Sequence, residues 1–212
     1  MDIAEVANHA PVIPVLTIDR IADAVPLARA LVKGGLPVLE ITLRTPVALE
    51  ALKAIASDVP EAIVGAGTVL NEAQLDQIQA AGARFGVSPG GTAALAAAAR
   101  KARMPFLPAV QTASEALGLA ELGFTVLKFF PASSAGGPAW LKAIAAPLPG
   151  IRFCPTGGIS QENAPTYLAL PNVSCVGGSW VAPPAAVAAG RWDDIERLAA
   201  AAATLKRALP PA

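Results

Sequence analysis

One lysine, Lys128, stands in an otherwise apolar stretch, "FTVLKFFPA" (124–132). The neighbouring Val, Leu and Phe residues favour a β-strand. Burying an unpaired ammonium group costs several kcal/mol, so Lys128 either reaches solvent at a strand end or is buried because its chemistry requires it. A neutral lysine amine in apolar surroundings can attack a carbonyl carbon and form a Schiff base. The residue type and its setting therefore indicate nucleophilic amine catalysis.

A second ionisable side chain, Glu40, interrupts the apolar stretch "LEITLR" (39–44). Strand side chains alternate between two faces, so Glu40, Thr42 and Arg44 share the face opposite the three aliphatic residues. If the aliphatic face packs on helices, Glu40 and Lys128 point to the same interior, with Arg44 nearer the carboxyl end. A simple buried ion pair is the alternative, disfavoured because such pairs are poor sources of stability. A nearby Arg44 would favour the neutral amine, and a charged Glu40 would oppose it.

Strand-like runs recur about every 20–25 residues between alanine- and leucine-rich segments with helical spacing. There are eight: 12–16, 37–43, 62–67, 84–88, 105–110, 125–130, 151–155 and 173–178. Residues typical of helix N-caps stand before several helical segments. These are Asp19, Thr45, Asn71, Thr92 and Ser160.

Eight strand–helix units predict an α/β fold, a compact (β/α)8 TIM barrel that occupies residues 1–212 as a single domain. The alanine-rich segment 185–212 is interpreted as the last helix. A doubly wound open sheet is the weaker alternative, since no GxGxxG follows the first strand.

Composition excludes several functions. The 212 residues carry a formal net charge of zero, which is unlike a nucleic-acid-binding protein. No apolar run approaches the roughly 20 residues of a membrane span, and the N-terminus is a poor signal peptide. We therefore expect a cytoplasmic protein without membrane or nucleic-acid partners. A single histidine, His9, excludes a multi-histidine metal site within one chain, and Cys154 and Cys175 are interpreted as buried packing residues. We expect no metal and no cofactor.

Two glycine-rich turns follow the last two predicted strands, "PTGGIS" (155–160) and "VGGSW" (176–180). In TIM barrels these two loops commonly hold a phosphate through backbone N–H groups. Tight turns without a ligand are the alternative for one such pair, and two pairs at these places favour a phosphate site.

The stretches "LEITLRT", "VGAGTVL", "VSPG", "KFFPA", "FCPTGGIS" and "VGGSW" resemble the 2-keto-3-deoxy-6-phosphogluconate aldolases, class I aldolases on a small (β/α)8 barrel. The resemblance runs from about Val12 to Trp192. It implies cleavage of a keto acid phosphate to pyruvate and glyceraldehyde 3-phosphate in the Entner–Doudoroff pathway, and a homotrimer. Lys128 would be the Schiff-base lysine, Glu40 the general acid/base and Arg44 a contact of the substrate carboxylate.

The remaining positions that the resemblance assigns form two groups. Pocket residues around the pyruvyl portion would be Thr68, Pro89, Phe130 and Thr156. The phosphate end would comprise Gly157, Gly158, Gly178 and Ser179, with Arg20 as a further contributor. The segment 132–137 receives no role.

Three other functions remain open from the sequence. The first is a related aldolase for 4-hydroxy-2-oxoglutarate or 2-keto-3-deoxy-6-phosphogalactonate. The second is a phosphosugar isomerase or epimerase of the same fold, in which Lys128 would be an electrostatic group. The third is a phosphate-binding barrel without activity.

Overall fold

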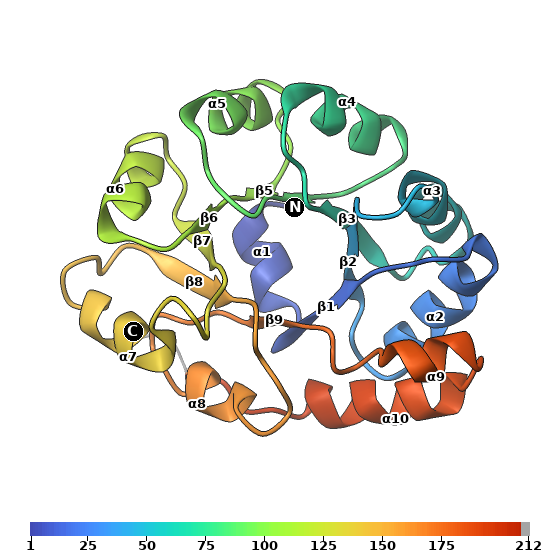
Figure 1. The fold of residues 1–212 in the computed structure, drawn as a ribbon. Helices are drawn as coiled ribbons and strands as arrows, with labels where there is room; N and C mark the ends of the chain where they lie inside the picture. Colours follow the sequence, from blue (N-terminus) through green and yellow to red (C-terminus); the bar gives the residue numbers. More distant parts are fainter. Residues whose placement is uncertain (209–212) are drawn as a thin grey trace.

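The computed structural model describes residues 1–208, in which parallel strands form a curled, half-barrel sheet with helices on its outer side (Figure 1). The strands fall at the eight predicted places. They are β1 (Val12–Leu16), β2 (Val38–Thr42), β3 (Ile63–Gly67), β4 (Gly86–Val87), β5 (Phe106–Leu107), β6 (Ala109–Val110), β7 (Val126–Phe129), β8 (Arg152–Pro155) and β9 (Val176–Gly178). The run 105–110 gives two short strands because Pro108, which lacks an N–H donor, stands between them.

Strand pairing follows the chain. Six strands pair in the order β5-β4-β3-β2-β1-β9, and three in the order β6-β7-β8. Two parallel bridges, Phe153 with Val173 and Thr156 with Gly177, join β8 to the segment of β9. The carboxyl ends of the strands therefore lie at the same end of the curled sheet, where the polar strand residues were predicted to meet.

The helices between the strands pack on the outer face of the sheet (Figure 1). They are α2 (Ile21–Lys33), α3 (Ala48–Asp58), α4 (Glu72–Ala80), α5 (Ala93–Lys101), α6 (Ala113–Glu121), α7 (Gly137–Ile144), α8 (Ala164–Leu168), α9 (Pro184–Ala188) and α10 (Trp192–Ala203). A further helix, α1 (Ile3–Asn8), precedes the first strand and was not predicted.

Two of the predicted caps are confirmed. The side chain of Asn71 accepts a hydrogen bond from the N–H of Gln74, and that of Thr92 accepts one from Leu95. Asp19 and Thr45 do not cap, because α2 and α3 begin after Arg20 and Val47 without a side-chain cap.

Other hydrogen bonds take the place of the predicted caps after β2 and β8. The Thr45 hydroxyl instead donates to the carbonyl of Ile18 at 2.6 Å, tying the β2–α3 turn to the loop after β1. Ser160 was also misplaced, since α8 begins after Asn163, whose side-chain oxygen accepts the Ser160 N–H.

The predicted last helix is two helices, and residues 209–212 of that prediction lie outside the described part of the chain. The break falls at Gly190, whose φ of +63° is a left-handed conformation that residues with a Cβ adopt only at a cost. Here α9 ends and the chain turns back to start α10.

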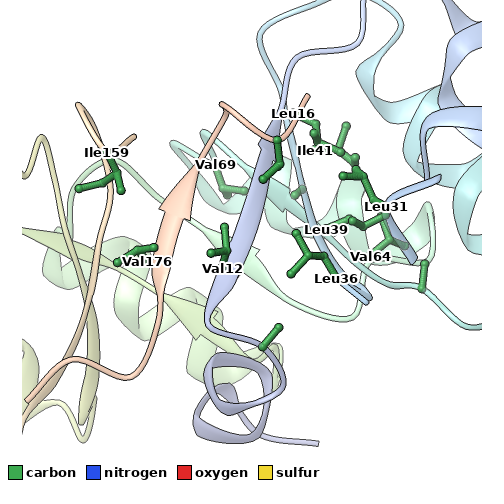
Figure 2. Close-up of a cluster of buried hydrophobic side chains, with 14 of the residues drawn as sticks. Val12, Leu16, Leu31, Leu36, Leu39, Ile41, Val64, Val69, Ile159 and Val176 are labelled. Atoms are coloured by element: carbon green, nitrogen blue, oxygen red, sulfur yellow. The ribbon is translucent and has the colours of Figure 1, made fainter. Parts of the chain in front are cut away.

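Two apolar clusters divide the core. The larger lies between strands and helices and contains the outward side chains Leu39 and Ile41, as predicted (Figure 2). The smaller lies inside the curled sheet, where Val38 and Val126 meet Val6 of α1. Because Val38 and Val126 begin their strands, α1 covers the amino-terminal end of the interior, and the carboxyl-terminal end is left for polar residues. Within residues 1–208, no helix is long and apolar enough to cross a membrane.

Candidate active site

Lys128 and Glu40 meet inside the curled sheet. Nζ of Lys128 lies 3.1 Å from Oε1 of Glu40, and the two side chains are only 5% and 3% exposed. Lys128 sits in β7 between partners on β6 and β8, and Glu40 sits in β2 between partners on β1 and β3. The predicted inward face of both strands is confirmed, and so is the ion pair that had been disfavoured.

Glycine makes room for the Glu40 carboxylate. A Cβ on Gly67, at the end of β3, would lie 2.8 Å from both Cγ and Cδ of Glu40 and closer still to Oε1. Ordinary carbon–carbon contacts are about 3.5–4.0 Å. Gly67 therefore fixes where the carboxylate can lie, a function that was not predicted from the sequence.

Lys128 faces a cavity of about 600 Å³ at the carboxyl ends of the strands. The Phe130 ring stands beside the amine, with its centroid 5.3 Å from Nζ. Nine of the twelve predicted site residues line this cavity. They are Lys128, Arg44, Phe130, Thr156, Gly157, Gly158, Gly178, Ser179 and Arg20.

The other three predicted residues lie differently. Glu40 reaches the cavity through its contact with Lys128. Thr68 lies behind Arg44, and its hydroxyl accepts a hydrogen bond from Nε of Arg44 at 3.2 Å. Thr68 directly follows β3 and has a φ of +63°, a rare conformation for a β-branched residue. Pro89 lies half-buried in the turn after β4 and is not among the cavity residues.

The glycine turns form the far wall of the cavity. Gly157 and Gly158 have φ of +96° and +73°, so both need glycine. Gly178 is not in that conformation, and glycine is needed there because a Cβ would strike the ring of Trp180.

The segment 132–137, which had been given no role, supports this wall. The Ser133 N–H donates to the Gly157 carbonyl at 3.1 Å, and its hydroxyl donates to the Gly158 carbonyl at 3.0 Å. These bonds use carbonyl groups of the turn, and among residues 1–208 the N–H groups of Gly157 and Gly158 donate to no backbone carbonyl.

The loop after β1 adds polar groups that were not predicted. The Thr42 hydroxyl donates to the Leu16 carbonyl at 2.9 Å and lies 3.2 Å from the Thr17 hydroxyl. Since its only proton is used, Thr42 accepts from Thr17, which lines the cavity. Asp23, in the first turn of α2, also lines the cavity and pairs with Arg20. The signal that could have identified this pair is the Arg-x-x-Asp spacing at a helix start.

The two cysteines lie in the interior, as predicted. A hydrogen bond with Cys154 and complete burial raise the pKa of the Cys175 thiol well above its usual range. Cys175 is therefore a protonated packing residue at neutral pH. Among the described residues, no group of three or more His, Cys, Asp or Glu side chains is arranged to hold a metal ion.

A curled parallel α/β sheet carries a buried lysine and glutamate beside a glycine-lined cavity at the carboxyl ends of its strands, an arrangement typical of lysine-dependent enzymes of the aldolase class. The family model for KDPG and KHG aldolase matches residues 3–198. This chain belongs to the KDPG and KHG aldolase family.

Three known proteins illustrate the similarity. The 2-dehydro-3-deoxy-phosphogluconate aldolase of Pseudoalteromonas atlantica is 52% identical, over 92% of this chain and 91% of the relative. The KDPG aldolase of Legionella pneumophila, with pyruvate captured as a covalent carbinolamine intermediate, superposes with a TM-score of 0.94 at 46% identity, over 96% of this chain and 99% of the other. The aldolase of Zymomonas mobilis with 3-phosphoglycerate gives 0.93 at 50% identity, over 99% of both chains.

Proposed function

We propose that this chain is a class I aldolase that cleaves 2-keto-3-deoxy-6-phosphogluconate to pyruvate and glyceraldehyde 3-phosphate. The observation that carries the proposal is the buried Lys128–Glu40 pair, 3.1 Å apart, facing a cavity with a glycine-lined wall. The names of relatives about 50% identical support the same reaction.

Glu40 first prepares the nucleophile. The Lys128 ammonium cannot attack a carbonyl, and Oε1 of Glu40 is the base within hydrogen-bond distance to receive its proton. The neutral amine then adds to the C2 ketone of the substrate and gives a carbinolamine. The Glu40 proton leaves with the carbinolamine hydroxyl as water, and a protonated imine remains on Lys128.

Bond cleavage uses the same two residues. The Glu40 carboxylate, acting through a water molecule, takes the proton of the C4 hydroxyl. The C3–C4 electron pair moves into the imine as the bond breaks, so glyceraldehyde 3-phosphate leaves and an enamine remains. Glu40 returns the proton to C3, and water hydrolyses the imine to release pyruvate and the Lys128 amine. The imine serves as the electron sink, a role that a metal ion has in other aldolases.

The other predicted residues are assigned along the cavity. Arg44, oriented by Thr68, would bind the substrate carboxylate, and Phe130 and Thr156 would enclose the pyruvyl portion. The N–H groups of the two glycine turns, with Ser179 and Arg20, would bind the phosphate. Pro89 is not among the residues that line the cavity, and its role as a wall residue remains a proposal.

We also propose that the strands complete a (β/α)8 barrel and that residues 1–212 form a single domain. The bridges from β8 to the segment of β9, and the single residue between β5 and β6, support closure of the sheet. The KDPG aldolases of high structural similarity support the same fold. A homotrimer remains a prediction from the resemblance, and a cytoplasmic location remains a prediction from the composition.

Reductive trapping tests the function. Pyruvate with borohydride should inactivate the protein and attach a reduced pyruvyl group to Lys128, read by peptide mass spectrometry. Lys142 and the other exposed lysines serve as internal controls within the same digest. A label on any of them in place of Lys128, or no inactivation at all, would refute the Schiff-base assignment. Turnover of 2-keto-3-deoxy-6-phosphogluconate to pyruvate completes the test.

A further inference from the structure

The cavity contains a carboxylate where an anionic ligand is expected. Asp23 lines the same cavity as the glycine turns, and its side chain is only 10% exposed. A carboxylate in that wall would repel a phosphate unless a cation covers it. Arg20 supplies this cation, because it forms an ion pair with Asp23.

Arg20 is held at three points. Its Nε lies 2.8 Å from Oδ2 of Asp23, and its Nη2 lies 2.9 Å from Oδ1, so the pair is bidentate. Nη2 also donates to the carbonyl of Ala188, the last residue of α9, at 3.3 Å. Asp23 thus ties the guanidinium across the gap between the β1–α2 loop and the helix after β9.

The remaining donors of Arg20 are left for a ligand. Among residues 1–208, its Nη1 has no hydrogen-bond partner, and it carries two N–H groups. The Arg20 side chain is 59% exposed and that of Asp23 only 10%, so a ligand in the cavity has more access to the guanidinium than to the carboxylate. These two N–H groups diverge within the guanidinium plane, and each can donate a charge-assisted hydrogen bond to a phosphate oxygen.

We infer that Asp23 is a positioning residue for phosphate recognition: it fixes the Arg20 guanidinium against the cavity wall with Nη1 directed to the substrate phosphate. This inference rests on the proposed function, because the ligand is the phosphate of the proposed substrate. Asp23 does not touch the substrate and acts through Arg20.

A double-mutant cycle tests the inference, with kcat/KM for 2-keto-3-deoxy-6-phosphogluconate compared with 2-keto-3-deoxygluconate, the same keto acid without phosphate. Arg20→Ala removes the guanidinium and uncovers the carboxylate, so it should lower the ratio of the two values most, by about tenfold to a hundredfold. Asp23→Asn should lower it by roughly threefold to tenfold, through KM more than kcat. The double variant should lose less than Arg20→Ala alone, since no unpaired carboxylate remains.

Arg20→Lys separates geometry from charge. Lysine keeps the charge but cannot form the fork that joins Asp23 and the Ala188 carbonyl. The ratio should fall severalfold, and Asp23→Asn should add nothing in that background. An independent readout is the rise in Tm that inorganic phosphate gives by mass action, which should be smaller in Asp23→Asn than in wild type.

Arg191 and Asp194 provide the matched control. They form another Arg–Asp pair with the same spacing, with Nε 3.0 Å from Oδ2, outside the cavity lining. Asp194→Asn should leave the ratio unchanged. If Asp23→Asn has the wild-type ratio, lowers kcat/KM equally for both substrates or tightens phosphate binding, the positioning role is refuted. If wild type is not trapped by pyruvate and borohydride, the aldolase assignment itself is refuted.

Discussion

Gly67→Ala should impair catalysis by displacing the Glu40 carboxylate. The new Cβ would lie 2.8 Å from Cγ and Cδ of Glu40, whereas ordinary contacts are about 3.5–4.0 Å. Gly67 ends β3 and pairs with Thr42 of β2, so the backbone cannot retreat without breaking the sheet. Glu40 must therefore move by roughly 1 Å and lose its 3.1 Å contact with Lys128.

The expected loss of activity follows from that displacement. A misplacement of about 1 Å in a catalytic group can cost on the order of 10²-fold in rate. We expect kcat for 2-keto-3-deoxy-6-phosphogluconate to fall by about that factor, measured as pyruvate release. Trapping by pyruvate and borohydride should still label Lys128 but more slowly, because Glu40 no longer takes the ammonium proton.

Stability must be measured beside activity. Overpacking a core typically costs about 1–3 kcal/mol, or roughly 2–12 °C in Tm for a chain of this size. Gly34→Ala is the matched control, since its Cβ would lie 2.5 Å from that of Ala199, between α2 and α10 and outside the cavity lining. Gly34→Ala should lose a similar amount of stability and keep its kcat. Wild-type kcat in a folded Gly67→Ala variant would refute the assignment of Glu40 as the proton carrier.

Three further predictions address separate parts of the site. Glu40→Gln should lower kcat by about 10²–10⁴-fold at saturating substrate, and near wild-type turnover would show that another group moves the proton. Gly178→Ala should lower the ratio of kcat/KM for 2-keto-3-deoxy-6-phosphogluconate over 2-keto-3-deoxygluconate by roughly tenfold, because Trp180 must shift; equal losses for both substrates would remove the glycine turns from the phosphate site. The burial of both cysteines, together with the pKa of Cys175 that its hydrogen bond with Cys154 and burial raise, predicts that neither thiol reacts with an aromatic disulfide reagent at pH 8 unless denaturant is added; rapid native labelling would contradict the packing assignment.

The strands and the inward direction of Glu40 and Lys128 could be predicted from the sequence. The alternation around Glu40 and Lys128 fixes which side chains share a face, and apolar burial determines which face meets the helices. Those two rules involve only neighbours along one strand. The buried positions of both residues therefore follow from each strand taken by itself.

Features set by contacts between distant segments could not be predicted. The role of Gly67 depends on Glu40 in the adjacent strand, and that of Ser133 on the Gly158 carbonyl of another loop. Thr45 has the residue type of a cap, yet its hydroxyl bonds the Ile18 carbonyl of a different loop. The helix α1 has only six residues, and its hydrophobic partners come from strands elsewhere in the chain. Tertiary contacts decide these cases over local preference.

From the sequence, a buried ion pair and a nucleophilic lysine were alternative interpretations of Lys128. In the proposed mechanism they are two protonation states of the same Lys128–Glu40 pair. An ammonium at Lys128 needs a partner in a site that is almost closed to water, and Glu40 supplies it at 3.1 Å. The same distance lets the proton pass to the carboxylate, which leaves two neutral groups whose burial no longer costs charge desolvation. In the proposed mechanism, the pair keeps each buried charge matched in the resting enzyme and becomes nucleophile and acid in one proton transfer. In that mechanism, a carbonyl substrate enters from the cavity, and the Lys128 amine bonds its carbon in place of the ion pair with Glu40.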